Sequence, residues 1–222
     1  MKLARASYLL LLLISTLAIG CDEKTVPKQS DDTQTLFWNE DSVNAALPTE
    51  YNHLEEAENG NFALVNAAKK IIDPSIVYDP AYVRIKYPMG DVDPGTGVCT
   101  DVVIRAYRGL GIDLQQEVHE DMKANFNKYP KAWGMTKPDP NIDHRRVPNL
   151  MTFFSRKGKS LPITDDPADY KPGDIVCWDL GGGLYHIGIV LDNPRSILHN
   201  IGGGQIVEDC LFSWKIIGRY SY

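Results

Sequence analysis

The sequence predicts an α+β domain whose helices come first and whose antiparallel sheet comes last. Up to about residue 156, apolar residues recur three or four positions apart, as they do on the buried face of a helix. Beyond Pro162 the spacing changes to the alternation typical of strands, and glycine or Asp-Asn-Pro turns separate the apolar runs. Strands joined by such short turns pair antiparallel. Helices followed by strands in this order indicate the α+β class.

Residues 1–20 have the features of an export signal. Lys2 and Arg5 precede an apolar run of about a dozen residues, which is too short to span a bilayer of about 30 Å. The run leads through small residues into Cys21, and this ending resembles the lipobox of bacterial lipoproteins. The resemblance implies an exported protein that is anchored to the membrane by lipid at Cys21 and faces the periplasm or the cell surface. The alternative is an ordinary cleaved signal with an incidental cysteine.

The remaining chain divides into a tether and one domain. A polar, acidic segment over 21–52 shows little periodicity, so we interpret it as a tether ahead of a single domain over 53–222. Residues 78–97 hold several prolines and turn residues, which indicate an ordered loop. Four segments have the apolar spacing of helices, at about 62–72, 99–110, 114–126 and 148–156. Five segments alternate like strands, at 175–178, 186–191, 196–200, 205–209 and 216–222.

Composition and charge narrow the classes of function. The net charge is −6 and no basic cluster is larger than Arg145-Arg146, so a nucleic-acid partner is not expected. Peptides, glycans or proteins are the expected partners. The sequence holds no dense metal-ligand motif, so we predict neither a metal site nor a cofactor. We expect the chain to be a monomer.

The cysteines suggest a nucleophile. After Cys21, three cysteines remain, so at least one thiol should be free. Cys99 lies two residues after Gly95-Thr96-Gly97 at the start of a predicted helix, and a helix start or a nearby imidazolium lowers a thiol pKa. Cys99 is therefore the candidate nucleophile, with alkylation expected to stay fast below pH 7. The alternative, a small buried apolar residue, is our interpretation of Cys177, while Cys210 is either a packing residue or its disulfide partner.

Two of the five histidines, His186 and His199, lie on consecutive predicted strands. If residues 192–195 form the turn, His199 lies opposite Gly188, one diagonal step from His186 and roughly 7 to 8 Å away on the same face. Asn200 would then point to the opposite face. The two histidines are either a base with its orienting partner or two ordinary hydrogen-bonded polar residues.

Two motifs in the predicted sheet resemble those of the NlpC-type cell-wall peptidases, which belong to the papain-like group. They are Pro-Gly-Asp-Ile-Val at 172–176 and His-Ile-Gly-Ile-Val-Leu at 186–191. The resemblance implies a papain-like fold in which helices, one carrying Cys99, pack on a five-stranded antiparallel sheet. It also implies that Cys99 is the nucleophile, His186 the base and His199 the residue that orients the base.

A wider likeness covers residues 60 to 222. The chain is similar there to the bacterial domain-of-unknown-function family numbered 1287, through the stretches 77–80, 97–103 and 141–148. It departs from the NlpC-type pattern beside the cysteine, where Val98 stands in place of aspartate and Thr100-Asp101 in place of serine-glycine. Asp101 either caps the helix through its carboxylate, which we favour, or binds a substrate amine.

Further candidate substrate-binding residues lie upstream and downstream of Cys99. A tyrosine upstream of the cysteine often lines the site in the papain-like group, and the candidates here are Tyr78, Tyr82 and Tyr87. The segment Asp143-His144-Arg145-Arg146 is either a solvated charged turn or a substrate contact, because arginine binds carboxylates bidentately. The predicted function is a cysteine hydrolase that cleaves an amide bond in peptidoglycan stem peptides. The alternative is a papain-like module that has lost turnover and binds a cell-wall peptide or a partner protein.

Overall fold

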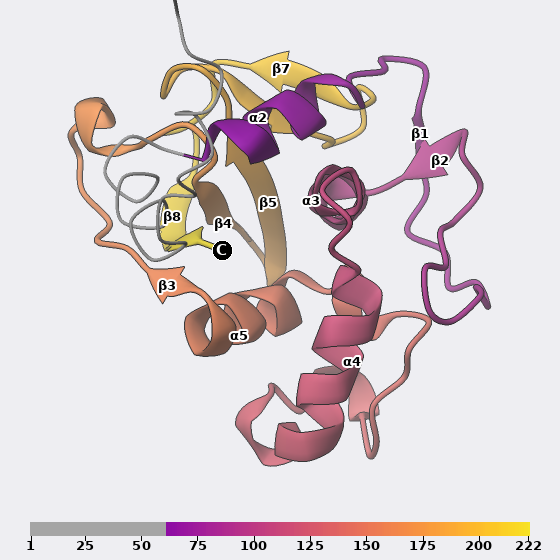
Figure 1. The fold of residues 1–222 in the computed structure, drawn as a ribbon. Coiled ribbons are helices and arrows are strands. Elements are labelled where there is room, and N and C mark those ends of the chain that lie inside the picture. The colour runs from indigo at the N-terminus through magenta and orange to yellow at the C-terminus, as the bar shows by residue number, and fades with distance from the viewer. Residues whose placement is uncertain (1–60) are drawn as a thin grey trace, which may run out of the picture. The chain divides into compact units, whose positions relative to one another are not determined.

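The structure is a computed structural model that describes residues 61–222 (Figure 1). The predicted signal peptide, the tether, Cys21 and the first residues of the predicted domain lie outside the described residues. Within the described part, no helix combines the length and the apolar character that crossing a membrane requires.

The four predicted helices are present. Their bounds are Phe62–Lys69 for α2, Cys99–Arg108 for α3, Leu114–Asn125 for α4 and Val147–Lys157 for α5. Local caps fix several of these ends: the Asn61 side chain accepts from the Leu64 N–H, and the Asp113 side chain accepts from the Gln115 N–H. The loop ahead of α3 is irregular, as expected, apart from a short parallel pair between β1 (Val77–Tyr78) and β2 (Thr96–Gly97).

The C-terminal half forms one antiparallel sheet with the strand order β3-β8-β4-β5-β6-β7. The bounds are Lys159–Ser160 for β3, Ile175–Gly181 for β4, Leu184–Val190 for β5, Ile197–His199 for β6, Ile206–Glu208 for β7 and Lys215–Ser221 for β8. All five predicted strands are present, but the expectation of a five-stranded sheet is wrong, since the sheet has six. The additional strand, β3, is two exposed polar residues that pair with β8, too short for any alternation to reveal.

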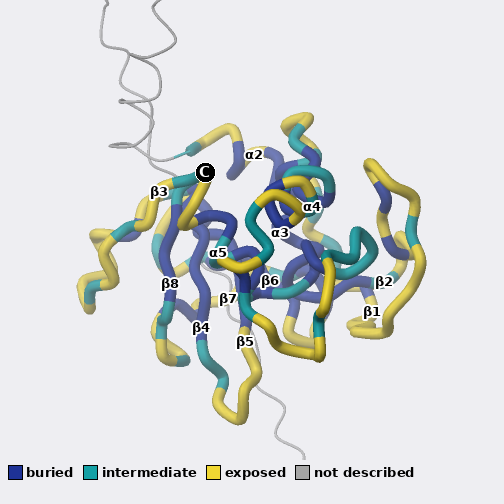
Figure 2. Tube along the Cα trace, turned by 90° about the horizontal axis from the view of Figure 1, so that it is seen from below, coloured by how far each residue is buried: buried dark blue, intermediate teal, exposed yellow. Residues whose placement is uncertain are grey.

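The sheet is covered on both faces. On one face, α2, α3 and α5 pack against β5, and α5 also packs against β8; Val102 of α3 and Ile187 of β5 belong to the same large apolar cluster. Helix α4 packs against α3 and α5. On the other face, Trp178 and Ile197 belong to a second, smaller cluster. Figure 2 shows that β4 and β5 are buried along most of their length and exposed where the hairpin between them turns. The fold is therefore α+β, as predicted.

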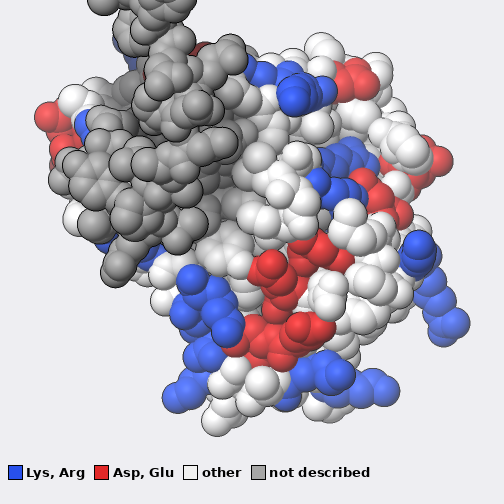
Figure 3. Space-filling model, viewed as in Figure 1, with Lys and Arg blue, Asp and Glu red and all other residues white. Residues whose placement is uncertain are grey.

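The described surface carries both signs of charge. On the face drawn in Figure 3, Lys and Arg side chains are interspersed with Asp and Glu side chains. Near the middle of that view Asp and Glu side chains form one group, with Lys and Arg side chains on either side of it.

Candidate active site

Cys99 is the first residue of α3, and the sheet and the loop hold this helix start in place. The Val98 N–H donates to the Asp101 carboxylate at 2.7 Å, so the predicted helix cap is present. Asn200, at the end of β6, donates from its side chain to the Gly97 carbonyl at 3.3 Å. The start of α3 is thereby tied to the strand that carries His199. Asn200 points away from the histidine pair, as the alternation predicted, but it is fully buried.

Asp101 and Arg145 form a buried ion pair next to Cys99. Arg145 donates from Nε and Nη2 to the two oxygens of the Asp101 carboxylate, both at 2.9 Å. Each side chain is only 2% exposed. The remaining guanidinium donors reach the carbonyls of Asp79 and Ala81 at 3.4 Å. Neither group is available to a substrate, and the interpretation of residues 143–145 as a solvated turn is wrong because all three are buried.

The two histidines form a continuous hydrogen-bonded chain with a carboxylate. His186 Nε2 lies 2.7 Å from His199 Nδ1, and His199 Nε2 lies 2.7 Å from Glu208 Oε2. The predicted register is confirmed, since Ile189 pairs with Leu198 and His199 therefore falls opposite Gly188. A Cβ at Gly188 would lie 2.9 Å from Ile197 Cγ2 and 3.3 Å from His199 Cβ, so a larger residue would crowd β6 at the position of His199.

Aromatic rings surround this chain. The rings of Trp178 and Trp214 lie 5.7 and 5.8 Å from that of His186, centroid to centroid. The two histidines are buried as a result. Burial lowers the pKa of His186 to about 3 and also lowers the pKa of His199, although Glu208 acts in the opposite direction on His199. Both imidazoles are neutral at pH 7.

The Cys99 thiol lies beside β5, but on the face of the sheet opposite the His186 ring: Cys99 packs in the same apolar cluster as Ile187, whereas His186 pairs with Trp178 of the other cluster. The backbone N–H groups of Ile187, Thr100 and Cys99 itself are close enough to the sulfur to favour its thiolate. In the described part of the chain, no hydrogen bond joins this thiol to the His186 ring. Burial outweighs the three donors and raises the pKa of Cys99 to about 12. The expected lowering of this pKa is therefore wrong, because the sequence does not show how completely the helix start is buried.

This shift reverses the expected pH dependence of alkylation. A free cysteine has a pKa near 8.5, so a pKa of about 12 reduces the thiolate fraction at pH 7 about 10³-fold. We expect iodoacetamide to label Cys99 slowly at pH 7 and about tenfold faster for each unit of pH up to pH 10. Peptide mapping by mass spectrometry measures the rate at this cysteine. A rate that is already high and constant between pH 6 and pH 8 would show a stabilised thiolate and contradict the prediction.

Cys99 opens into a pocket of about 430 Å³. Its wall combines aromatic, proline and arginine side chains, including those of Tyr78, Tyr82, Trp133, Arg145, Arg146, Leu184 and Tyr185. Of the two arginines on this wall, Arg146 is the more accessible, with 20% of its side chain exposed. Its guanidinium lies 4.4 Å from the Trp133 ring and 3.7 Å from the Asp143 carboxylate. Burial and the neighbouring Cys99 raise the pKa of Tyr78 to about 12, so its hydroxyl keeps its proton.

Two of the predicted substrate-binding residues lie elsewhere. Tyr87 does not line this pocket; its ring packs edge-on against His119 at 5.2 Å, beside α4. His144 is buried and does not line the pocket, its Nδ1 has no hydrogen-bond partner among the described residues, and burial lowers its pKa to about 3. These residues were predicted from their type and their position along the chain, and neither determines the direction in which a side chain points.

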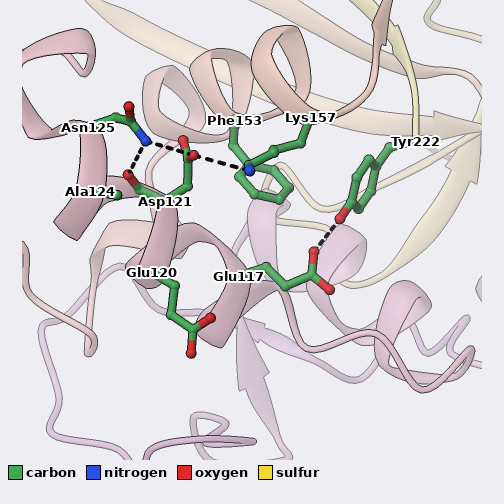
Figure 4. A pocket seen from close by; sticks show the side chains of 8 residues that line it. All are labelled: Glu117, Glu120, Asp121, Ala124, Asn125, Phe153, Lys157 and Tyr222. Carbon is green, nitrogen blue, oxygen red and sulfur yellow. Dashed lines mark hydrogen bonds and ion pairs between the residues drawn. The ribbon is translucent and has the colours of Figure 1, made fainter.

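A second hollow lies between α4, α5 and the C-terminal residue (Figure 4). Its lining is acidic, with Glu117, Glu120 and Asp121. The acids already have partners: Asp121 accepts from Arg156 at 2.7 Å and from Tyr129 at 2.7 Å, and the Tyr222 hydroxyl donates to Glu117. These contacts join the helices to each other and leave Cys99 and its pocket as the better candidate site. Among residues 61–222, no cluster of acids, histidines and cysteines is arranged to hold a metal ion.

The fold and the site define an α+β protein with a cysteine at a helix start and, in the adjoining strands, two buried histidines hydrogen-bonded to a partly exposed glutamate. The chain belongs to the family described as Domain of unknown function (DUF1287), which it matches over residues 65–222. It is similar to the Uncharacterized protein YijF of Escherichia coli (strain K12), with 51% identity over 169 residues that cover 74% of this chain and 82% of that protein. The family expected from the sequence is confirmed.

Proposed function

We propose that this chain is a cysteine hydrolase that cleaves an amide bond, with Cys99 as nucleophile, His186 as base and His199 as the residue that orients the base. One observation carries the proposal. Cys99 lies on the wall of a pocket at a helix start, with the backbone N–H groups of Ile187, Thr100 and Cys99 itself directed at its sulfur. The His186 ring is in turn held by His199 at 2.7 Å.

The mechanism starts from a neutral thiol and a neutral imidazole. As the Cys99 sulfur attacks the amide carbonyl carbon, its proton passes to the ring nitrogen of His186 that is not bonded to His199, a step that requires the His186 ring to turn from the opposite face of the sheet toward Cys99. Backbone N–H groups at the start of α3, including that of Cys99, stabilise the oxyanion. The C–N bond then breaks, the amine leaves with the proton from His186, and a thioester remains. Water attacks the thioester through the same base, which releases the acid and restores the thiol.

The proposed substrate is a peptide bond in the stem peptides of peptidoglycan. The resemblance to NlpC-type peptidases favours this substrate, and so does the pocket wall. Arg146 provides a cation that can bind a peptide carboxylate, and Tyr78, Tyr82 and Trp133 provide flat apolar surfaces for the rest of the peptide.

Incubation with purified wall fragments tests this proposal. We expect the full chain to release new amine termini, detected by mass spectrometry, and the variant Cys99→Ala to release none. Release by both proteins would identify a contaminant, and release by neither would rule out the proposed substrate.

The second candidate function is a binding module without turnover. The specific observation in its favour is the burial of the nucleophile, which raises the pKa of Cys99 to about 12 and leaves the thiol without a hydrogen bond to His186 among the described residues. In this case the same fragments would bind to the full chain, and to Cys99→Ala with equal affinity, without being cleaved.

We also propose that the protein is held to the cell envelope by lipid at Cys21. Cys21→Ser is expected to give an exported protein that lacks acyl chains and is released in soluble form, because stable anchoring requires two chains. Incorporation of radiolabelled palmitate measures the attachment. Equal incorporation by the variant and the unchanged chain would exclude Cys21 as the lipid acceptor.

A further inference from the structure

Glu208, on β7, extends the histidine pair by a third hydrogen-bonded group. We infer that Glu208 is a positioning residue that fixes the tautomers of both His199 and His186, so that the His186 nitrogen facing away from His199 carries no proton. The consequence for catalysis rests on the proposed function, but the tautomers themselves do not depend on it.

The argument follows the hydrogen bonds inward from the carboxylate. A carboxylate only accepts, so the Nε2 of His199, 2.7 Å from Glu208 Oε2, must carry the proton. A neutral imidazole has one N–H, so His199 Nδ1 is an acceptor. His186 Nε2, at 2.7 Å from it, must then be the donor. This leaves Nδ1 of His186 with a free lone pair, which is the form that a general base requires.

Cys210 is a second possible partner for His199 Nε2, the nitrogen that contacts Glu208. The Cys210 sulfur lies 3.7 Å from this nitrogen. Burial raises the pKa of Cys210 to about 12, so it is a neutral thiol that donates to an imidazole nitrogen better than it accepts. If Cys210 replaced Glu208 as the partner, His199 would carry its proton on Nδ1 and donate it to His186 Nε2. The proton of His186 would move to Nδ1 and block the base.

The test compares Glu208→Ala with Asp209→Ala as a matched control. Both variants remove one carboxylate from neighbouring, partly exposed positions, 45% and 51% exposed in the side chain. Asp209 contacts Arg195 instead of a histidine. The readout is the ¹⁵N shift of each imidazole nitrogen in the labelled full chain at pH 7, assigned with His186→Ala and His199→Ala.

We expect the unchanged chain and Asp209→Ala to show both histidines protonated at Nε2. Glu208→Ala is expected to move both protons to Nδ1, and the double variant Glu208→Ala/Cys210→Ala to show a smaller movement because the thiol is gone. Protons that stay on Nε2 in Glu208→Ala, or a His186 proton on Nδ1 in the unchanged chain, would overturn the inference. If the protons move equally in Glu208→Ala and in Glu208→Ala/Cys210→Ala, Cys210 has no part in setting the tautomers.

An activity measurement separates this inference from the proposed function. If the chain hydrolyses wall fragments, Glu208→Ala should lower kcat by up to about 10⁴-fold, the loss known for a catalytic histidine in the wrong tautomer, and leave KM unchanged. Tautomers that shift as expected without any hydrolysis would retain the inference and contradict the proposed function. Hydrolysis by a chain whose histidine tautomers do not change in Glu208→Ala would support the proposed function and contradict this inference.

Discussion

Cys99→Ala is expected to abolish amide hydrolysis, with a loss on the order of 10³-fold or more, because removing one member of a catalytic unit disables the whole unit. The fold should persist, since the change removes one sulfur atom at the start of α3 while the cap from Asp101 remains. Release of amine termini from wall fragments measures the activity, and the melting temperature of the same preparation measures the fold.

Cys177→Ala is the matched control for this prediction. Cys177 is a fully buried thiol on β4 that packs in the same apolar cluster as Cys99 but does not line the pocket. Its removal should lower the free energy of unfolding by a few kcal/mol at most and leave turnover unchanged at temperatures where the variant is folded. Near-normal hydrolysis by Cys99→Ala, or a loss confined to Cys177→Ala, would show that the nucleophile has been misassigned.

Patterns of local spacing predicted the helices and the position of the histidine pair. The start of α3 at Cys99 follows from Gly-Thr-Gly and the apolar residues after it. The place of His199 opposite Gly188 follows from turn length and alternation alone. The alternation of side chains along a strand would also have predicted Glu208. Ile206 of β7 lies opposite His199, so Glu208 is one diagonal step from His199, as His186 is on β5, the other neighbour of β6.

Burial and long-range contacts were the features that spacing could not predict. The pKa of Cys99 depends on how tightly the loop, α3 and β5 close around the sulfur, which are segments far apart in the sequence. The ion pair between Asp101 and Arg145 joins residues 44 positions apart. Asn200 points away from the histidines as expected, but the sequence does not show that its side chain is fully buried and donates to the Gly97 carbonyl, so Asn200→Ala should destabilise the fold.

The second large effect concerns the ion pair that supports the start of α3. Asp101→Ala is expected to lower the free energy of unfolding by about 3–5 kcal/mol, because it leaves the Arg145 guanidinium buried without its counter-charge. The variant also leaves the Val98 N–H without the carboxylate that caps the helix. Urea unfolding of the full chain measures the loss.

Two comparisons separate burial from charge as the cause of this loss. Asp192→Ala removes the partner of Lys69 from a surface ion pair of 2.6 Å whose side chains are 41% and 55% exposed, and it should cost at most about 1 kcal/mol. Asp101→Ala/Arg145→Met removes both buried charges and should recover part of the stability that Asp101→Ala loses, because no buried charge is then left unpaired. Equal losses from Asp101→Ala and Asp192→Ala would show that the buried pair does not hold Cys99 and its helix in place.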